Sequence, residues 1–311
     1  IETKLTEEME AVESINLGKA SRMSDAQGRY VEFCKSSFNN LDLSGLSILL
    51  DCANGATYSV APKVFSELGA KVHSIGASPD GININQNCGS TSPDTLKEEV
   101  SKGNYDIGIA FDGDGDRILI IAADGTILDG DDILYILSKQ ISDDSGIVGT
   151  LMTNKSLELH FKENQIDFVR ADVGDKYVLQ KLIEKAWHLG GEPSGHIICL
   201  DAAQTGDAII AALKVLDAIK DESFSLTKAL EEFEKFPQTL INLKVDNPNK
   251  IIVSDKFWQK VTDIELQLGE EGRVLIRPSG TEPLIRIMVE SREQKISDSL
   301  CNVLAELALT I

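Results

Sequence analysis

The sequence has few basic residues, no long apolar run and no leader at its start. Its 30 Lys and Arg stand against 50 Asp and Glu, and this net charge of -20 disfavours attraction to nucleic acid and to anionic lipid over the surface as a whole. No apolar run approaches the roughly 18 residues that suggest a membrane-spanning helix, and no basic and apolar leader opens the chain. We therefore expect no nucleic acid and no membrane as partners, and an anionic substrate must meet local basic groups.

The sequence also lacks paired cysteine motifs. Its 5 cysteines are widely spaced and make no C-x-x-C pair. This spacing predicts neither a disulfide framework nor a zinc site. Free cysteines favour a reducing compartment, so we expect a cytoplasmic protein.

The length and the start of the chain predict part of a multidomain protein. The 311 residues, 42% of them hydrophobic and 26% charged, suffice for two or three globular domains. The chain opens on Ile1 rather than Met, and residues 2–16 indicate an acidic helix without a preceding strand. We expect a chain that begins partway through a larger protein.

Strands and helices alternate along most of the sequence. This alternation is typical of α/β domains, whereas the order after residue 238 is β-α-β-β-α with an antiparallel pair, which predicts a small α+β module. The expected strands are 47–51, 71–75, 105–112, 118–122, 146–152, 166–171, 186–189, 197–200, 240–245, 273–277 and 284–290. The expected helices are 61–69, 130–142, 156–164, 175–185, a helix from 206, 226–233, 255–268 and 293–307.

Two predicted helix starts echo each other, with GDDI at 130–133 and GDAI at 206–209. Duplicated domains explain the echo. Two ordinary acidic N-caps explain it as well.

The strongest local signal is the loop 112–117, DGDGDR, which connects two predicted strands. Asp112, Asp114 and Asp116 alternate with glycines, which let the backbone curl until the carboxylates converge on a hard divalent cation such as Mg²⁺. A calcium EF-hand also starts D-x-D-x-D, but it needs Gly and Glu where this sequence has Arg117 and Ala123. A solvated acidic turn is the alternative.

A second candidate loop, GGEPSGH at 190–196, lies between two short predicted strands. Glu192, Ser194 and His196 offer a carboxylate, a hydroxyl and an imidazole on a flexible loop, a set able to hydrogen-bond vicinal hydroxyls of a sugar. The serine stands one place too late for the G-x-S-x-G elbow of a serine hydrolase. A plain Gly/Pro turn explains the same residues equally well.

A third candidate, RPSGTEP at 277–283, joins two strands of the last module. The guanidinium of Arg277, the hydroxyls of Ser279 and Thr281, and the backbone N–H groups around Gly280 suit a phosphate dianion. A structural hairpin turn leaves the flanking Arg286 unexplained, so we favour phosphate. The sequence has no Walker A motif and no complete dinucleotide fingerprint, so we expect no nucleotide cofactor.

The three loops, in this order, resemble the α-D-phosphohexomutase family. Four further stretches extend the resemblance over nearly the whole chain: LGKASR at 17–22, RYVEFCK at 29–35, DCANGATY at 51–58 and VGDKYV at 173–178. The residues of these stretches favour a subfamily that acts on an amino sugar.

The resemblance implies two tandem α/β mixed-sheet domains of phosphohexomutase type and a C-terminal α+β domain similar to the TATA-binding protein. We call the loop 112–117 the metal loop, the loop 190–196 the sugar loop and the turn 277–283 the phosphate turn. Residues 1–34 are expected to be a remnant of the family's first domain with a linker. The expected domains that follow are an α/β domain at 35–128, which contains the metal loop, an α/β domain at 129–238, which contains the sugar loop, and the α+β domain at 239–311, which contains the phosphate turn. The family's first domain carries a phosphorylated serine, and no stretch of this sequence matches that loop. We therefore expect this chain to be inactive alone.

Carried onto matching positions, the resemblance implies Mg²⁺ bound by the three aspartates and a transferring phosphoryl group stabilised by Arg117. It also implies contacts of the sugar loop with sugar hydroxyls and of the last turn with the phosphate that is not transferred. Glu192 and Ser194 are implied to contact the sugar hydroxyls, and His196 is implied to support their loop. The phosphate contacts are Arg277, Ser279, Gly280 and Thr281. Positive groups near the reacting oxygens are Lys19 and Lys176, with Arg22.

The reaction implied is the interconversion of glucosamine 6-phosphate and glucosamine 1-phosphate, through a phosphoserine enzyme and a 1,6-bisphosphate, on the route to UDP-N-acetylglucosamine. Because the bisphosphate must turn around, we expect a hinge near 236–239. The resemblance is compatible with a homodimer. A sibling mutase for glucose or mannose phosphates is one alternative, and a non-catalytic sugar-phosphate-binding protein is another.

Overall fold

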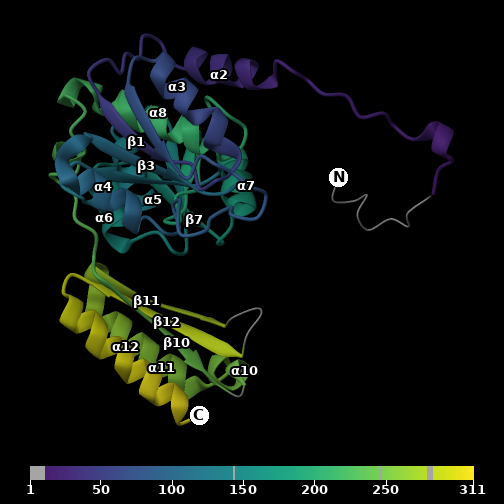
Figure 1. Cartoon of the computed structure of the whole chain (residues 1–311). Helices are drawn as coiled ribbons and strands as arrows, with labels where there is room; N and C mark the ends of the chain where they lie inside the picture. The colour runs from purple at the N-terminus through teal and green to yellow at the C-terminus, as the bar shows by residue number, and fades with distance from the viewer. Residues whose placement is uncertain (1–10, 143, 246, 279–282) are drawn as a thin grey trace.

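The computed structural model describes residues 11–142, 144–245, 247–278 and 283–311. They form a larger α/β body that follows an extended N-terminal segment, and a smaller C-terminal domain below that body in Figure 1. Over the part of the chain that the structure describes, no helix combines the length and the hydropathy needed to cross a membrane.

The first sheet of the larger body has the strand order β2-β1-β3-β4-β5. The strands are β1 (Ser47–Asp51), β2 (Lys71–Ile75), β3 (Ile107–Phe111), β4 (Ile118–Ala122) and β5 (Ile127–Leu128). β1, β2 and β3 run parallel, and β4 and β5 are antiparallel to their neighbours. Every residue of β3 is buried, as expected for a central strand that is covered on both faces.

The second sheet repeats this topology with the order β7-β6-β8-β9. Its strands are β6 (Gly146–Thr150), β7 (Asp167–Ala171), β8 (Leu189–Gly191) and β9 (Ile197–Cys199). The first three run parallel and the last is antiparallel, as in β1 to β4. The echo at 130 and 206 thus accompanies a repeated topology. It also marks two real N-caps, because the Asp129 and Asp207 side chains each accept two backbone N–H groups of the helix that follows.

Helices cover both sheets. They are α2 (Ala26–Ser36), α3 (Ala61–Glu67), α4 (Asp94–Glu99), α5 (Gly130–Ser138), α6 (Lys155–Glu163), α7 (Asp175–Lys185), α8 (Ala208–Ile219) and α9 (Leu226–Ala229).

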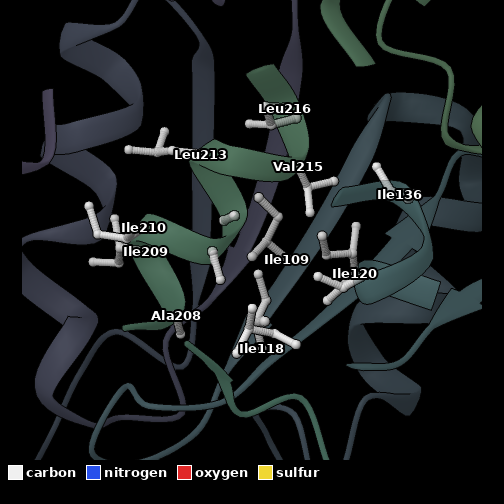
Figure 2. Close-up of a cluster of buried hydrophobic side chains, with 14 of the residues drawn as sticks. Ile109, Ile118, Ile120, Ile136, Ala208, Ile209, Ile210, Leu213, Val215 and Leu216 are labelled. Carbon is white, nitrogen blue, oxygen red and sulfur yellow. The ribbon is translucent and has the colours of Figure 1, made fainter. Parts of the chain in front are cut away.

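One hydrophobic core joins the two α/β sheets. Helix α8 follows the second sheet in the sequence, yet it packs against β4 of the first sheet as well as against β9. Figure 2 shows Ile109 and Ile120 of the first sheet beside Val215 of α8. The shared core holds the loops at the ends of β3 and β8 at fixed positions relative to each other.

The C-terminal domain has its own three-stranded antiparallel sheet, in the order β10-β12-β11, and its own core. Side chains alternate across its strands, so Val274 and Ile276 face the helices while Arg273 and Arg277 point to the opposite face. The elements are β10 (Gln238–Lys244), α10 (Pro248–Ile252), α11 (Asp255–Leu268), β11 (Gly272–Pro278), β12 (Leu284–Ser291) and α12 (Gln294–Leu309).

The structure corrects several predicted elements. The acidic helix expected at 2–16 is wrong over residues 11–16, which hold only a 3₁₀ turn at Ser14–Asn16, and residues 1–10 lie outside the described residues. Residues 11–16 bury no side chain, so nothing stabilises a helix there. The helix predicted over 226–233 ends at Ala229, because the chain turns and the Phe233 ring stacks on Tyr135 at 4.4 Å between centroids. α5 likewise ends at Ser138 rather than 142.

Candidate functional site

The acidic loop connects β3 to β4 and curls around its first aspartate. Asp112 follows β3, and its Oδ1 accepts the backbone N–H groups of Gly115, Asp116 and Arg117, each at 3.1 Å. Gly115 has a φ of +79°, a conformation that glycine adopts without strain. Asp112 is only 7% exposed, so its carboxylate shapes the loop from inside.

The three carboxylates converge. One oxygen from each of Asp112, Asp114 and Asp116 lies within 4.8 Å of the others. Burial, and next the neighbouring Asp116, raise the pKa of the Asp112 carboxyl, and Asp116 Oδ1 is buried with no hydrogen-bond partner among the described residues. A bound cation would stabilise the ionised form of Asp112 and would give Asp116 Oδ1 a partner. The donor set, all carboxylate oxygen, fits a hard divalent cation such as Mg²⁺.

A basic group and an imidazole flank this cluster. Arg117 is 48% exposed, and its Nε lies 3.8 Å from both Asp112 Oδ2 and Asp116 Oδ1. His196 is buried, and its Nδ1 lies 3.0 Å from Asp116 Oδ2. His196 therefore contacts the metal loop directly, a contact beyond the support of its own loop that we expected.

The backbone joins the metal loop to the sugar loop. Arg117 and His196 form an isolated antiparallel bridge, and the Ile118 N–H donates to the Gly195 carbonyl at 3.1 Å. A Cβ on Gly195 would lie 2.0 Å from the Ile118 carbonyl oxygen, so only glycine permits this approach. The two loops come from different sheets and are joined by these backbone contacts.

The sugar loop is a tight turn between β8 and β9 that is closed by backbone hydrogen bonds. The Glu192 N–H donates to the His196 carbonyl at 3.0 Å, and the Gly130 N–H of α5 donates to the Pro193 carbonyl at 3.2 Å. Glu192 is buried, and Ser194 is exposed at the tip. These bonds, together with the burial of Glu192, hold the loop in one conformation.

Glu192 also positions the start of α7. Its Oε2 accepts the Gly174 N–H at 3.0 Å. Lys176 is exposed in the first turn of that helix. The structure thus links the segment of Lys176 to the sugar loop, while its role stays a prediction.

The predicted phosphate turn is only partly described. Ser279, Gly280 and Thr281 lie outside the described residues. Arg277 of β11 and Arg286 of β12 stand directly opposite each other in the ladder. Like charges at opposite positions repel, and a bound anion removes that cost.

Lys19 and Arg22 lie in an exposed segment that runs away from the larger body in Figure 1. The structure does not bring them to the metal loop. Their assignment to the reacting oxygens stays a prediction.

Asp51, a supporting residue next to the metal loop, was not among the predicted site residues. Asp51 is fully buried, and its carboxylate accepts the N–H groups of Ala53 at 3.0 Å and Gly89 at 2.7 Å. It thereby holds the segment after β1, whose Ala56 N–H donates to the Gly113 carbonyl at 2.8 Å. The sequence signal for this role was the position of Asp51 at the end of an otherwise apolar strand.

Comparisons with known proteins match this architecture over most of the chain. Models of the phosphoglucomutase/phosphomannomutase family match three stretches: alpha/beta/alpha domain II at residues 28–125, alpha/beta/alpha domain III at 129–236 and the C-terminal domain at 240–307. The expected domain boundaries differ from these stretches by a few residues and stay predictions.

Curated relatives are about half identical to the chain. The phosphoglucosamine mutase of Aeromonas salmonicida (strain A449) is 51% identical over 304 residues, which cover 96% of this chain and 68% of the relative. That of Legionella pneumophila (strain Corby) is 49% identical over 311 residues, which cover 98% of this chain and 68% of the relative. The chain thus spans about two thirds of the length of these relatives.

Solved structures share the fold. A phosphoglucomutase/phosphomannomutase family protein from Burkholderia thailandensis superposes with a TM-score of 0.77 at 23% identity, covering 92% of this chain and 64% of that one. Aspergillus fumigatus N-acetylphosphoglucosamine mutase, in complex with GlcNAc-6P and magnesium, superposes with a TM-score of 0.75 at 20% identity, covering 91% and 65%. The chain therefore belongs to the phosphoglucomutase/phosphomannomutase family, of which it spans domains II and III and the C-terminal domain.

Proposed function

We propose that the protein containing this chain interconverts glucosamine 6-phosphate and glucosamine 1-phosphate, the activity for which its bacterial relatives are named. The observation that carries the proposal is the convergence of Asp112, Asp114 and Asp116 within 4.8 Å, beside the Arg117 guanidinium. Phosphoryl transfer depends mainly on positioning and on neutralising negative charge, and this cluster is equipped for both.

The residues divide the work between loops. Mg²⁺, when bound by the three aspartates, supplies positive charge to a phosphoryl oxygen. Arg117 adds a second positive group next to them. Glu192 and exposed Ser194 orient the sugar through its hydroxyls, and His196 keeps their loop against the metal loop.

The C-terminal domain anchors the phosphate that is not being transferred. Arg277 and Arg286, opposite each other on β11 and β12, provide the guanidinium groups. The predicted contacts of Ser279, Gly280 and Thr281 belong to this same site. Because the sugar reverses its orientation, the site must accept the phosphate at either end.

The proposed reaction conserves the phosphoryl groups. The 1-hydroxyl of glucosamine 6-phosphate takes the phosphoryl group of a phosphoserine, which leaves the serine hydroxyl and a 1,6-bisphosphate. After the bisphosphate turns around, the serine takes the 6-phosphoryl group and glucosamine 1-phosphate departs. We place this serine in a part of the protein that residues 1–311 do not include.

We propose that the reaction takes place in the cytoplasm. All 5 cysteines are free and buried, which supports a reducing cytoplasm. The route to UDP-N-acetylglucosamine, a peptidoglycan precursor, consumes the product there. A homodimer stays a prediction, to be measured by sedimentation of the complete gene product.

The test is turnover by the complete gene product. Purified protein with Mg²⁺ and a trace of bisphosphate is given glucosamine, glucose or mannose 6-phosphate, and ³¹P NMR follows the 1-phosphates. We expect kcat/KM to be highest for glucosamine 6-phosphate. A preference for glucose or mannose phosphate would transfer the assignment to a sibling mutase, and binding without turnover would favour the non-catalytic alternative.

A further inference from the structure

The C-terminal domain contacts the larger body through a buried acidic side chain. Glu290 of β12 is 0% exposed. Its carboxylate accepts the Lys155 backbone N–H of α6 at 3.1 Å, Arg273 Nη2 at 3.1 Å and, in two shorter contacts, Arg273 Nε and Gln238 Nε2. A buried carboxylate is tolerated only when it is paired and hydrogen-bonded in this way.

Arg273 extends the same contact into the larger body. Its Nη1 donates to the Leu151 carbonyl at 2.7 Å, and its Nη2 donates to the Thr153 carbonyl at 2.8 Å. We call Arg273, Glu290, Gln238 and the turn 150–155 the polar joint. The planar guanidinium satisfies the carboxylate of its own domain and two carbonyls of the other domain at once.

The larger body holds its side of the polar joint rigidly. Arg170 of β7 donates through Nη1 to the Thr150 carbonyl at 2.8 Å and to the Thr153 carbonyl at 2.7 Å. Its Nη2 also pairs with Glu158 Oε2 at 2.7 Å. One arginine from each domain therefore binds the same buried turn.

The covalent connection between the domains is fixed beside the polar joint. Asn154 caps α6, and its side chain binds both backbone groups of Phe236: Nδ2 donates to the carbonyl at 3.0 Å, and Oδ1 accepts the N–H at 3.1 Å. The chain enters β10 at Gln238, which itself contacts Glu290. The domain is thus attached along one end of its sheet, where Gln238, Glu290 and Arg273 of the three strands lie side by side.

The paired arginines of the proposed phosphate site lie toward the other end of the same two strands. Arg273 stands opposite Glu290, and Arg277 stands opposite Arg286. The two pairs are four positions apart along the strands, which makes a lever of about 14 Å. A tilt of about 10° over this lever moves Arg277 by about 2 Å. A displacement of that size breaks a hydrogen bond to phosphate.

We propose that Arg273 and Glu290 are positioning residues that set where Arg277 and Arg286 meet the sugar phosphate. This proposal rests on the proposed function. The polar joint fixes one end of β11 and β12 on the turn 150–155, so the other end moves only by rotation about this joint.

The first experiment uses Arg273→Lys, which keeps the charge but loses the fork that reaches Glu290, Leu151 and Thr153 together. Small-angle scattering of the chain reports domain placement, and calorimetric titration with glucosamine 6-phosphate reports binding. We expect a larger radius of gyration and a binding constant weakened by about fivefold to tenfold, the equivalent of one hydrogen bond. In the complete gene product KM should rise by a similar factor.

The matched control is Lys162→Gln. Lys162 Nζ pairs with Glu270 Oε1 at 3.0 Å between the same two bodies, but both side chains are largely exposed. Such a pair contributes little, so domain placement and binding should stay as in the unmodified chain. Circular dichroism checks that each variant is folded, and Glu290→Gln, which keeps the shape of the side chain, provides a second variant.

The outcomes separate the two proposals. If Arg273→Lys and Glu290→Gln are folded and keep unmodified scattering and binding, the positioning role is wrong. If they change only the unfolding midpoint, the pair is merely structural, which also overturns the proposal. If the unmodified chain binds no glucosamine 6-phosphate and the complete gene product does not turn it over, the proposed function fails, whereas scattering still tests the polar joint.

Discussion

Asp112 and Asp114 differ in what they do for the metal loop. Asp112 is buried and accepts three backbone N–H groups of the loop, whereas Asp114 is exposed. We therefore expect replacement of Asp112 to disturb folding and the proposed metal binding together. Replacement of Asp114 should affect the proposed metal binding without disturbing folding.

We expect Asp114→Asn to lower the Mg²⁺-dependent activity of the complete gene product by at least about 100-fold, because a direct ligand matters at least as much as the groups that orient ligands. The unfolding midpoint should not change. Asp124→Asn, on the turn at the other end of β4, is the control, and chelation of Mg²⁺ should abolish activity of the unmodified enzyme. Full activity of the Asp114 variant at saturating Mg²⁺ would show that this carboxylate is not a ligand.

Arg277 is the proposed guanidinium contact of the phosphate that is not transferred. Arg277→Ala removes a charged hydrogen bond to phosphate, worth about 1.5–3 kcal/mol, so kcat/KM should fall by roughly tenfold to a hundredfold. KM should rise and kcat should fall, since both substrate and bisphosphate lose the contact. Lys256→Ala is the control, because Lys256 is exposed on α11, on the helical side of the same domain. Steady-state kinetics that match the unmodified enzyme would remove Arg277 from the site.

At the scale of elements, the start of α5 is an acidic cluster whose charge is incompletely balanced. Lys235 Nζ pairs with Asp129 at 2.7 Å and with Asp132 at 2.6 Å. Asp131 is 2% exposed, with one oxygen on the Asn154 N–H and the other without a partner among the described residues. Burial, and then the charge of Asp129, raise the pKa of Asp131 from 3.8 to about 8.

This cluster predicts a pH dependence of stability. Between about pH 4 and pH 8 the folded protein retains the Asp131 proton while the unfolded chain releases it, so the free energy of unfolding falls as pH rises. Burial also raises the pKa of Asp132, to about 6, which adds to the same trend.

Asp131→Asn keeps an oxygen for the Asn154 N–H and removes the titration. We expect the fall in unfolding free energy between pH 5 and pH 8 to shrink by on the order of 1 kcal/mol or more, since one pKa unit corresponds to about 1.4 kcal/mol. Urea unfolding of the chain at the two pH values measures it. An unchanged pH slope would contradict the assignment.

In the molecule as a whole, hydrophobic packing divides the described residues into two units, because each buried core cluster lies within one of the two bodies. The core that contains Leu213 of α8 runs through both α/β sheets, whereas the core that contains Ile287 of β12 lies within the C-terminal domain. Shared packing makes the larger body one cooperative unit, and the polar joint connects it to a second one.

We therefore expect two unfolding transitions. Leu213→Ala and Ile287→Ala each remove a fully buried side chain, at a cost of about 2–5 kcal/mol. The first should shift only the transition of the larger body, and the second only that of the C-terminal domain. Differential scanning calorimetry of both variants measures the shifts, and a single transition moved by both would refute the division.

Much of the fold was predictable because its signals are local. Apolar runs such as 47–51 and 118–122, and helices that begin after Asp129 or Ser254, follow from side-chain periodicity and capping. The resemblance to the phosphohexomutase family is confirmed. Predictions failed where a distant contact decides: helix α9 stops early because Phe233 turns to stack on Tyr135.

The chemistry proposed for the acidic loop was predictable from the sequence, because Asp112, Asp114 and Asp116 stand within five residues and glycines let their carboxylates converge. What supports that loop depends on contacts between distant segments. His196 reaches Asp116 from another sheet, and Arg273 reaches carbonyls 120 and 122 residues earlier in the chain. The physical reason is that such contacts form when separate elements pack together, and no periodicity within a short segment encodes that packing.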